Sequence, residues 1–203
     1  MSSKDEYPLQ ALEGATGPGL KHGSPTYAII RMIAGLLLMT VGTASMYVGM
    51  VGLKPIALEF EVSRSLGSVP YALFMVGYGF GGILLGRIAD KFGIFFPLLL
   101  GSLSVPLGLY LASISNEYWQ YIAALCLLTG LLGSSATFSP VVADISHWFT
   151  RKRGLALSIV ISGSYLAGAV WPPILQLFFD DHGWRTSLQL VAIISLCLML
   201  PLS

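Results

Sequence analysis

Six long runs without a charged residue constrain the fold of this 203-residue chain more than any other feature. Each run holds 18 to 26 residues, and a membrane-spanning helix needs about 20 apolar residues. Composition agrees, since 55% of the residues are hydrophobic and only 10% are charged. Strands of a membrane barrel would instead alternate in polarity over about 10 residues. The sequence therefore predicts an all-α membrane protein, in which each of six transmembrane helices satisfies its own backbone hydrogen bonds. The runs cover residues 32–53, 65–86, 92–116, 118–143, 154–179 and 186–203.

The chain divides into a polar tail and a helical bundle. Residues 1–26 are rich in Gly, Pro, Ser and charge, a composition that cannot bury enough apolar surface to fold, so we expect a disordered cytoplasmic tail. Residues 27–203 should form the bundle. Because the sixth run has only 18 residues and no basic loop behind it, we expect the chain to be cut from a longer protein. The predicted helices cover 27–53, 66–86, 94–114, 118–142, 154–179 and 186–203.

Basic residues set the expected orientation, because cytoplasmic loops of membrane proteins are enriched in Lys and Arg. If the first helix starts in the cytoplasm, eight of the 11 basic residues fall on the cytoplasmic side. The sequence therefore predicts that both chain ends are cytoplasmic. The eight are Lys4, Lys21, Arg31, Arg87, Lys91, Arg151, Lys152 and Arg153, and the other three are Lys54, Arg64 and Arg185.

A short sequence echo indicates an internal repeat. Asp90-Lys-Phe-Gly93 follows the second run, and Asp180-Asp-His-Gly183 follows the fifth. One three-helix unit would begin inside the cell and the other outside, as inverted-topology repeats require. We therefore expect a bundle of 3+3 helices.

Two motifs resemble known transporters. The stretch "GRIADKFG" resembles the loop between the second and third helices of the major facilitator superfamily, with Gly86, Asp90 and Gly93 at its fixed positions and Lys91 as the basic partner. The stretch "WFTRKRGLALSIVISGS" is similar to the segment that opens the fifth helix in monocarboxylate transporters and oxalate:formate antiporter-like proteins. Its matching positions are Phe149, Arg151, Lys152, Arg153, Leu155, Ala156 and Gly163. The resemblance implies the N-terminal six helices of a twelve-helix fold.

The same resemblance implies a gating role for the cytoplasmic loops. Asp90, beside Arg87 and Lys91, could pair with basic groups or with a helix N-terminus and break that contact when the transporter changes state. The alternative is a plain loop whose basic residues fix the orientation. In the second basic loop, Asp144 could pair with Arg151, Lys152 and Arg153, or lie in the headgroup region.

The runs contain small and polar residues but no ionisable ones, so these helices alone cannot build a proton relay. Hydroxyl side chains at helical spacing could form the walls of a substrate cavity, or they could serve interhelical packing. The candidate cavity residues are Thr40, Thr43, Tyr47, Thr137, Ser162 and Tyr165.

These features predict a secondary active transporter, or half of one, for a small organic anion such as a monocarboxylate or dicarboxylate. A non-transporting scaffold or assembly subunit is the alternative. An intramembrane hydrolase is disfavoured, because His22, His147 and His182 all lie outside the runs and no base accompanies a serine. We expect no enzyme activity, cofactor, metal or nucleic acid. The expected partners are the lipid bilayer and a second six-helix half, either a missing C-terminal half or a second copy. The expected location is the plasma membrane, as a bacterial inner-membrane protein.

Overall fold

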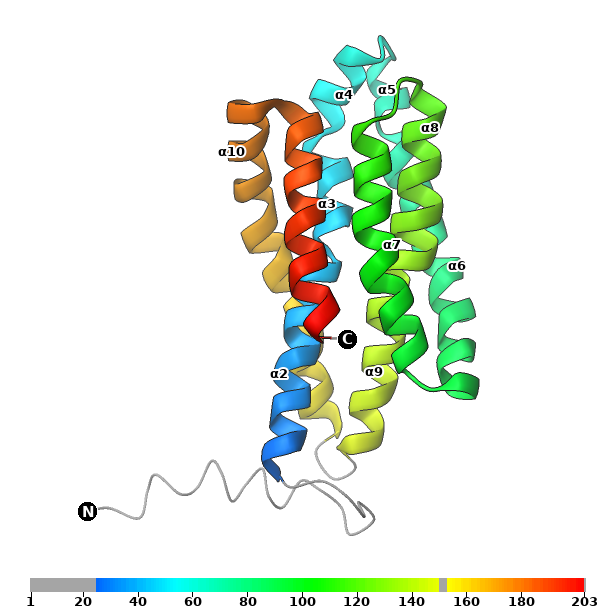
Figure 1. Cartoon of the computed structure of the whole chain (residues 1–203), viewed down its shortest axis with the longest axis vertical. Helices are drawn as coiled ribbons and strands as arrows, with labels where there is room; N and C mark the ends of the chain where they lie inside the picture. Colours follow the sequence, from blue (N-terminus) through cyan, green and yellow to red (C-terminus); the bar gives the residue numbers. More distant parts are fainter. Residues whose placement is uncertain (1–24, 150–152, 203) are drawn as a thin grey trace, which may run out of the picture.

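The computed structural model describes residues 25–149 and 153–202, and within those ranges every regular element is a helix. Five stretches are long and apolar enough to cross a membrane, namely Tyr27–Val51, Ser65–Phe92, Phe95–Ser113, Tyr118–Trp148 and Arg153–Leu202. The last of these breaks at Gly183, so six helices run along one long axis (Figure 1). This confirms the prediction of an all-helical membrane protein. The predicted tail falls almost wholly outside the described residues.

Three elements in line form the first helix, which starts with α2 (Pro25–Gly42) and continues through α3 (Ala44–Val51) and α4 (Leu53–Glu59). At the first junction the Thr43 hydroxyl donates to the carbonyl of Met39 (2.6 Å). The helix reaches past its predicted end at residue 53, because helices extend beyond the hydrocarbon core into the polar interface. The short α5 (Arg64–Gly67) then leads into α6 (Val69–Phe92).

Three elements in line also form the fourth helix. It follows α7 (Phe95–Ser113) and consists of α8 (Tyr118–Ala123), the π-helix η1 (Ala124–Ser134) and α9 (Ser135–Trp148). Its start is capped by Gln120, whose side-chain oxygen accepts from the backbone N–H groups of Asn116 (3.2 Å) and Glu117 (3.4 Å). A π-helix has i→i+5 hydrogen bonds and a wider backbone, and such segments often occur at functional sites.

Two glycines end helices in the same way. Gly93, after α6, has φ 85° and ψ 167°, and Gly183, within α10 (Arg153–Leu202), has φ 76° and ψ 161°. Side chains other than hydrogen are strained in this conformation, so both positions require glycine. The chain turns from α6 into α7 at the lower end of the bundle, whereas α10 folds back at the upper end (Figure 1).

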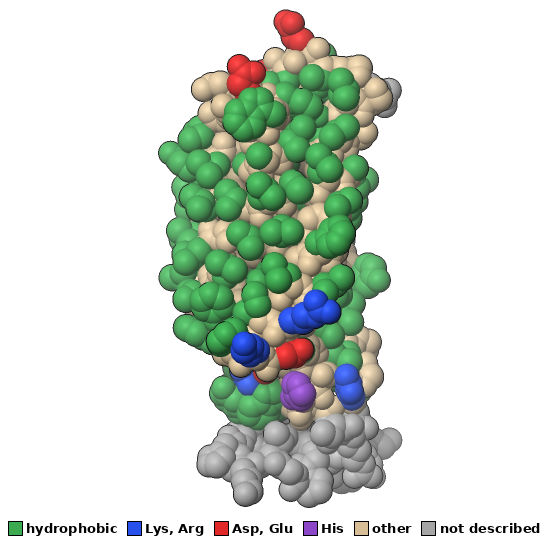
Figure 2. Space-filling view, turned by 90° about the vertical axis from the view of Figure 1, so that its right-hand side faces the viewer, with side chains coloured by type: hydrophobic (Ala, Val, Ile, Leu, Met, Phe, Trp, Pro, Cys, Tyr) green, Lys and Arg blue, Asp and Glu red, His purple; other side chains and the backbone are tan. Residues whose placement is uncertain are grey.

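The bundle packs through a buried apolar interior. α10 lies against α2 and α7, and α6 lies against η1 and α9. Fully buried side chains such as Val48, Leu109 and Leu188 fill the space between helices, whereas Phe80 and Leu177 are more than 60% exposed on the outside. Hydrophobic side chains cover the middle of the surface in Figure 2, and charged side chains gather at its two ends. This is the surface expected of a protein surrounded by lipid.

Candidate functional site

A pocket of about 250 Å³ opens among four of the six helices, and we call it the central pocket. The first, second, fourth and fifth helices line it, through α3 and its junction, α6, η1 with α9, and the first half of α10. α7 and the part of α10 after Gly183 contribute no lining residue. The lining residues are Thr43, Met46, Tyr47, Phe74, Met75, Tyr78, Ser134, Phe138, Ile161, Ser164 and Tyr165.

Helical spacing places these side chains together. Thr43 and Tyr47 are four residues apart, as are Phe74 and Tyr78, and residues four apart lie above one another on one helix face. Ser134 and Phe138 repeat this spacing across the junction of η1 and α9. Each helix therefore presents one narrow face to the pocket.

Three of the six sequence-predicted cavity residues line this pocket, namely Thr43, Tyr47 and Tyr165. The structure does not bring the other three there. The Thr40 hydroxyl donates to the carbonyls of Leu36 (2.9 Å) and Gly163 (3.0 Å), a contact that joins α2 to α10. Thr137 is buried and donates to its own helix, and Ser162, which is exposed, does the same. Thr40 and the buried Thr137 fit the alternative of interhelical packing, whereas the role of the exposed Ser162 stays a prediction.

The pocket combines aromatic rings with few free polar groups. The hydroxyl of Ser134 pairs with Ser45 (2.8 Å) and donates to the carbonyl of Gly42 (2.9 Å). Thr43 and Ser164 also donate within the bundle. The hydroxyls of Tyr47, Tyr78 and Tyr165 form no hydrogen bond with any part of the chain that the structure describes. No charged residue is among the described lining residues.

The sequence-predicted gating motif lies on a helix rather than in a loop. α6 continues to Phe92, so Gly86, Arg87, Asp90 and Lys91 occupy its last turns and Gly93 ends it. The loop assignment was wrong because three charges in eight residues do not stop a helix that has already left the hydrocarbon core. Arg87, Asp90 and Lys91 are exposed. Within residues 25–149 and 153–202, Asp90 forms no ion pair.

Gly86 has a packing role in this motif. A methyl group at Gly86 would lie 2.9 Å from the hydroxyl oxygen of Ser139, so α6 approaches α9 closely there. The exposed charges of the motif therefore lie at the end of a helix whose opposite face packs closely against α9.

Asp144, in the sequence-predicted second basic loop, lies on α9 and pairs with Arg31 of α2 (3.3 Å). The Arg31 guanidinium also lies over the Trp148 ring (5.0 Å to its centroid). Sequence reasoning missed this pair because Asp144 was assigned to a loop and the two residues are 113 positions apart. Arg153 begins α10 and is exposed. Arg151 and Lys152 lie outside the described residues.

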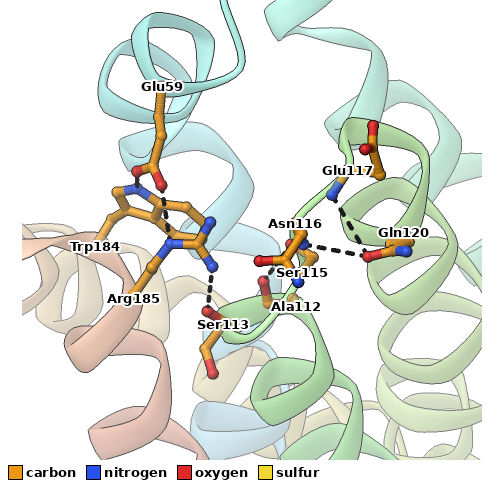
Figure 3. Close-up of polar contacts among 9 residues, drawn as sticks. All are labelled: Glu59, Ala112, Ser113, Ser115, Asn116, Glu117, Gln120, Trp184 and Arg185. Carbon is orange, nitrogen blue, oxygen red and sulfur yellow. Dashed lines mark hydrogen bonds and ion pairs between the residues drawn. The ribbon is translucent and has the colours of Figure 1, made fainter.

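A second ionic contact lies at the opposite end of the bundle. Nε of Arg185 donates to Glu59 (2.9 Å), and Nη1 donates to the carbonyl of Ser113 (2.7 Å). The Trp184 indole N–H donates to the other oxygen of the same carboxylate (Figure 3). This cluster joins the first, third and sixth helices. Sequence reasoning missed it because Glu59 and Arg185 are 126 positions apart.

Comparison with known proteins identifies a matching family and several relatives of the chain. Residues 32–203 match the Major Facilitator Superfamily. The chain is 35% identical over 165 residues to the MFS-type transporter pytF of Aspergillus terreus, a match that covers 81% of this chain and 53% of pytF. It is 33% identical over 117 residues to the agnestins efflux protein AgnL12 of Paecilomyces divaricatus, covering 58% of this chain and 26% of that protein.

One animal relative is also similar. Monocarboxylate transporter 13 of Bos taurus is 31% identical over 120 residues, which cover 59% of this chain and 28% of the transporter. The chain thus spans about half the length of pytF and matches smaller shares of the other relatives. These relatives come from fungi and an animal, so they give no support to a bacterial inner membrane.

Proposed function

The chain belongs to the major facilitator superfamily, and we propose that it forms the first six helices of a secondary active transporter that moves a small organic anion by alternating access. The superfamily consists of transporters rather than enzymes, which confirms that no catalytic site is needed. The observation that carries the proposal is the central pocket, which four helices of the bundle build together. Transporters of this kind bind substrate near the bilayer midplane, between two bundles.

The central pocket resembles one side of a larger binding site rather than a complete one. Its volume of about 250 Å³ is below the roughly 300–1,000 Å³ of complete small-molecule sites. Tyr165 at its rim is 77% exposed. A second six-helix half, from a longer chain or from a second copy, would cover this rim. Because the described lining residues carry no charge, that half would also have to supply the positive partner of a bound anion.

The paired glycine turns support an inverted-repeat arrangement. Gly93 ends the second helix and Gly183 ends the fifth, with φ and ψ values that agree within 10°. Each follows an aspartate three residues earlier, and the two turns lie at opposite ends of the bundle (Figure 1). Two three-helix units of inverted topology would place equivalent turns in this way.

The exposed end of α6 supports a gating role for Arg87, Asp90 and Lys91. These exposed charges can contact a second six-helix half in one conformational state and separate from it in another. Such a contact depends on the state of the transporter. Basic residues at the same end of the bundle as the start of α2 support a cytoplasmic N-terminus, in a transporter that we place in the plasma membrane.

Reconstitution into liposomes tests the proposal. The second six-helix half can be taken from pytF and expressed together with this chain. We expect saturable uptake of labelled lactate, pyruvate, formate or oxalate only when both halves are present. Tyr47→Ala should abolish uptake, whereas Tyr110→Ala, an exposed tyrosine of α7 outside the central pocket, should not. Uptake by the 203-residue chain alone would show that a second copy supplies the other half, and no uptake by either preparation at equal expression would contradict the proposal.

A further inference from the structure

We propose that the central pocket binds a planar aromatic group of the substrate that carries oxygen substituents. This inference rests on the proposed transport function and narrows its substrate class. Five of the lining side chains are aromatic rings, contributed by four different helices. They are Tyr47, Phe74, Tyr78, Phe138 and Tyr165.

The rings on the second and fourth helices form a connected platform. Phe74 and Tyr78 are nearly parallel, with centroids 6.3 Å apart and an angle of 10° between ring planes. Phe138 meets Tyr78 at 6.1 Å with an angle of 65°. Aromatic pairs favour offset-stacked and edge-to-face geometries with centroids 4.5–7 Å apart. A further ring, supplied by a substrate, can extend this series on the pocket side.

Burial separates this platform from ordinary core packing. Phe74 is 2% exposed and so provides a fixed base, whereas Tyr78 and Phe138 are only partly buried. Both rings line the central pocket, and both also border a separate groove between α6 and α9. A ring used only for packing would be covered on both faces. The platform therefore presents aromatic surface that a ligand can cover.

The polar groups of the pocket select the substituents. Thr43, Ser134 and Ser164 already donate hydrogen bonds within the bundle. The phenol groups of Tyr47 and Tyr78, and of Tyr165 at the rim, remain available within the described part of the chain. A phenol both donates and accepts, so it matches a hydroxyl or carbonyl oxygen. The described lining residues of the central pocket carry no charge. The pocket therefore recognises the aromatic ring of a substrate and the neutral oxygen substituents on that ring.

Binding of four small probes tests the proposal. Benzoate and benzamide are planar and aromatic, and cyclohexanecarboxylate and cyclohexanecarboxamide are their saturated counterparts. Binding to the 203-residue chain in lipid nanodiscs would be measured by equilibrium dialysis of labelled probes, with empty nanodiscs subtracted. We expect each aromatic probe to bind about threefold to tenfold more tightly than its saturated counterpart, the range that one aromatic pair contributes. Equal binding within each pair, or no binding of either aromatic probe, would overturn the inference.

Variants show whether the preference arises in the central pocket. Phe138→Leu should remove most of the aromatic preference, because leucine keeps apolar bulk without a ring. Trp119→Leu, at a 66% exposed ring on α8 outside the pocket, is the matched control and should keep it. Tyr78→Phe should preserve the ring selectivity, because it keeps the aromatic ring and removes only the hydroxyl. Loss of preference in Trp119→Leu but not in Phe138→Leu would overturn the assignment.

The design separates this inference from the transport proposal. The comparison of charged with uncharged probes addresses whether the substrate is an anion, and liposome uptake addresses transport. The comparison of aromatic with saturated probes addresses only the ring. A transporter that moves aliphatic and aromatic acids equally well would therefore retain the transport proposal and refute this one.

Discussion

At the scale of single residues, the contact between Arg31 and Asp144 should contribute measurably to stability. Their side chains are 30% and 17% exposed, so each charge is largely removed from water. Removing Arg31 leaves the Asp144 carboxylate largely buried without its ion-pair partner. Arg31→Ala should therefore lower the free energy of unfolding by about 1–2 kcal/mol, measured by reversible unfolding in mixed detergent micelles.

The control for this prediction is Arg87→Ala, which removes an exposed arginine that forms no ion pair within the described residues. This change should have an effect of less than about 0.5 kcal/mol. The exchange of both charges, Arg31→Asp with Asp144→Arg, should recover part of the loss. Equal stability of Arg31→Ala and Arg87→Ala would show that the contact contributes nothing.

The second prediction at this scale concerns Arg185. Its guanidinium reaches Glu59 through Nε and the Ser113 carbonyl through Nη1 (Figure 3). A lysine ammonium has three N–H donors on one nitrogen and so cannot reproduce the two separate nitrogens through which Arg185 reaches these acceptors. Arg185→Lys should therefore weaken the link between the sixth helix and the end of α7. Faster amide hydrogen exchange at residues 110–114 is the expected result, and unchanged exchange there would argue against the link.

At the scale of elements, the glycine turns are testable by single methyl groups. A methyl at Gly183 would meet no atom within 4 Å, so any penalty comes from the backbone conformation alone. With φ at 76° and ψ at 161°, Gly183→Ala should cost about 1–3 kcal/mol in unfolding free energy. Gly82→Ala also meets open space but lies within α6, so it should cause no loss. If both variants unfold alike, the turn does not require glycine.

The sequence predicted the helices well and their ends poorly. Apolar runs identify membrane-spanning helices because each segment must by itself be apolar and long enough to cross the bilayer. Helix ends follow no such rule, and both Arg31 and Asp144 lie on helices that continue past the charge-free runs. The two D-x-x-G turns were visible because a positive φ selects glycine locally.

The site was only partly predictable. Thr43, Tyr47 and Tyr165 were found by their polarity, whereas Phe74, Tyr78 and Phe138 were not. Helices that are apolar on all sides give no periodic signal to separate a ring facing a pocket from a ring facing lipid. Contacts between distant segments, such as Glu59 with Arg185, depend on the packing of the helices, which no local pattern specifies.

At the scale of the whole molecule, charge is distributed unevenly along the bundle axis. On the face in Figure 2, Lys, Arg and His side chains gather at the lower end beside an acidic side chain, whereas the charged side chains visible at the upper end are acidic. The lower end holds Arg31 and the end of α6, and the upper end holds Glu59 and the turn at Gly183. Since membrane insertion retains basic segments on the cytoplasmic side, the lower end should face the cytoplasm.

Cysteine labelling from outside the cell tests this orientation directly. Cys126 and Cys197 would first be replaced, and single cysteines would then be placed at Glu61 and Asp181 for the upper end and at Asp90 and Arg153 for the lower end. All four positions are exposed, so a failure to label reports the membrane barrier rather than burial. An impermeant maleimide should modify Glu61→Cys and Asp181→Cys in intact cells, and Asp90→Cys and Arg153→Cys only after the cells are made permeable. The reverse pattern would place the N-terminus outside, and because the exposed charges of α6 would then face the exterior, it would also remove the physical basis for a cytoplasmic gate at Asp90.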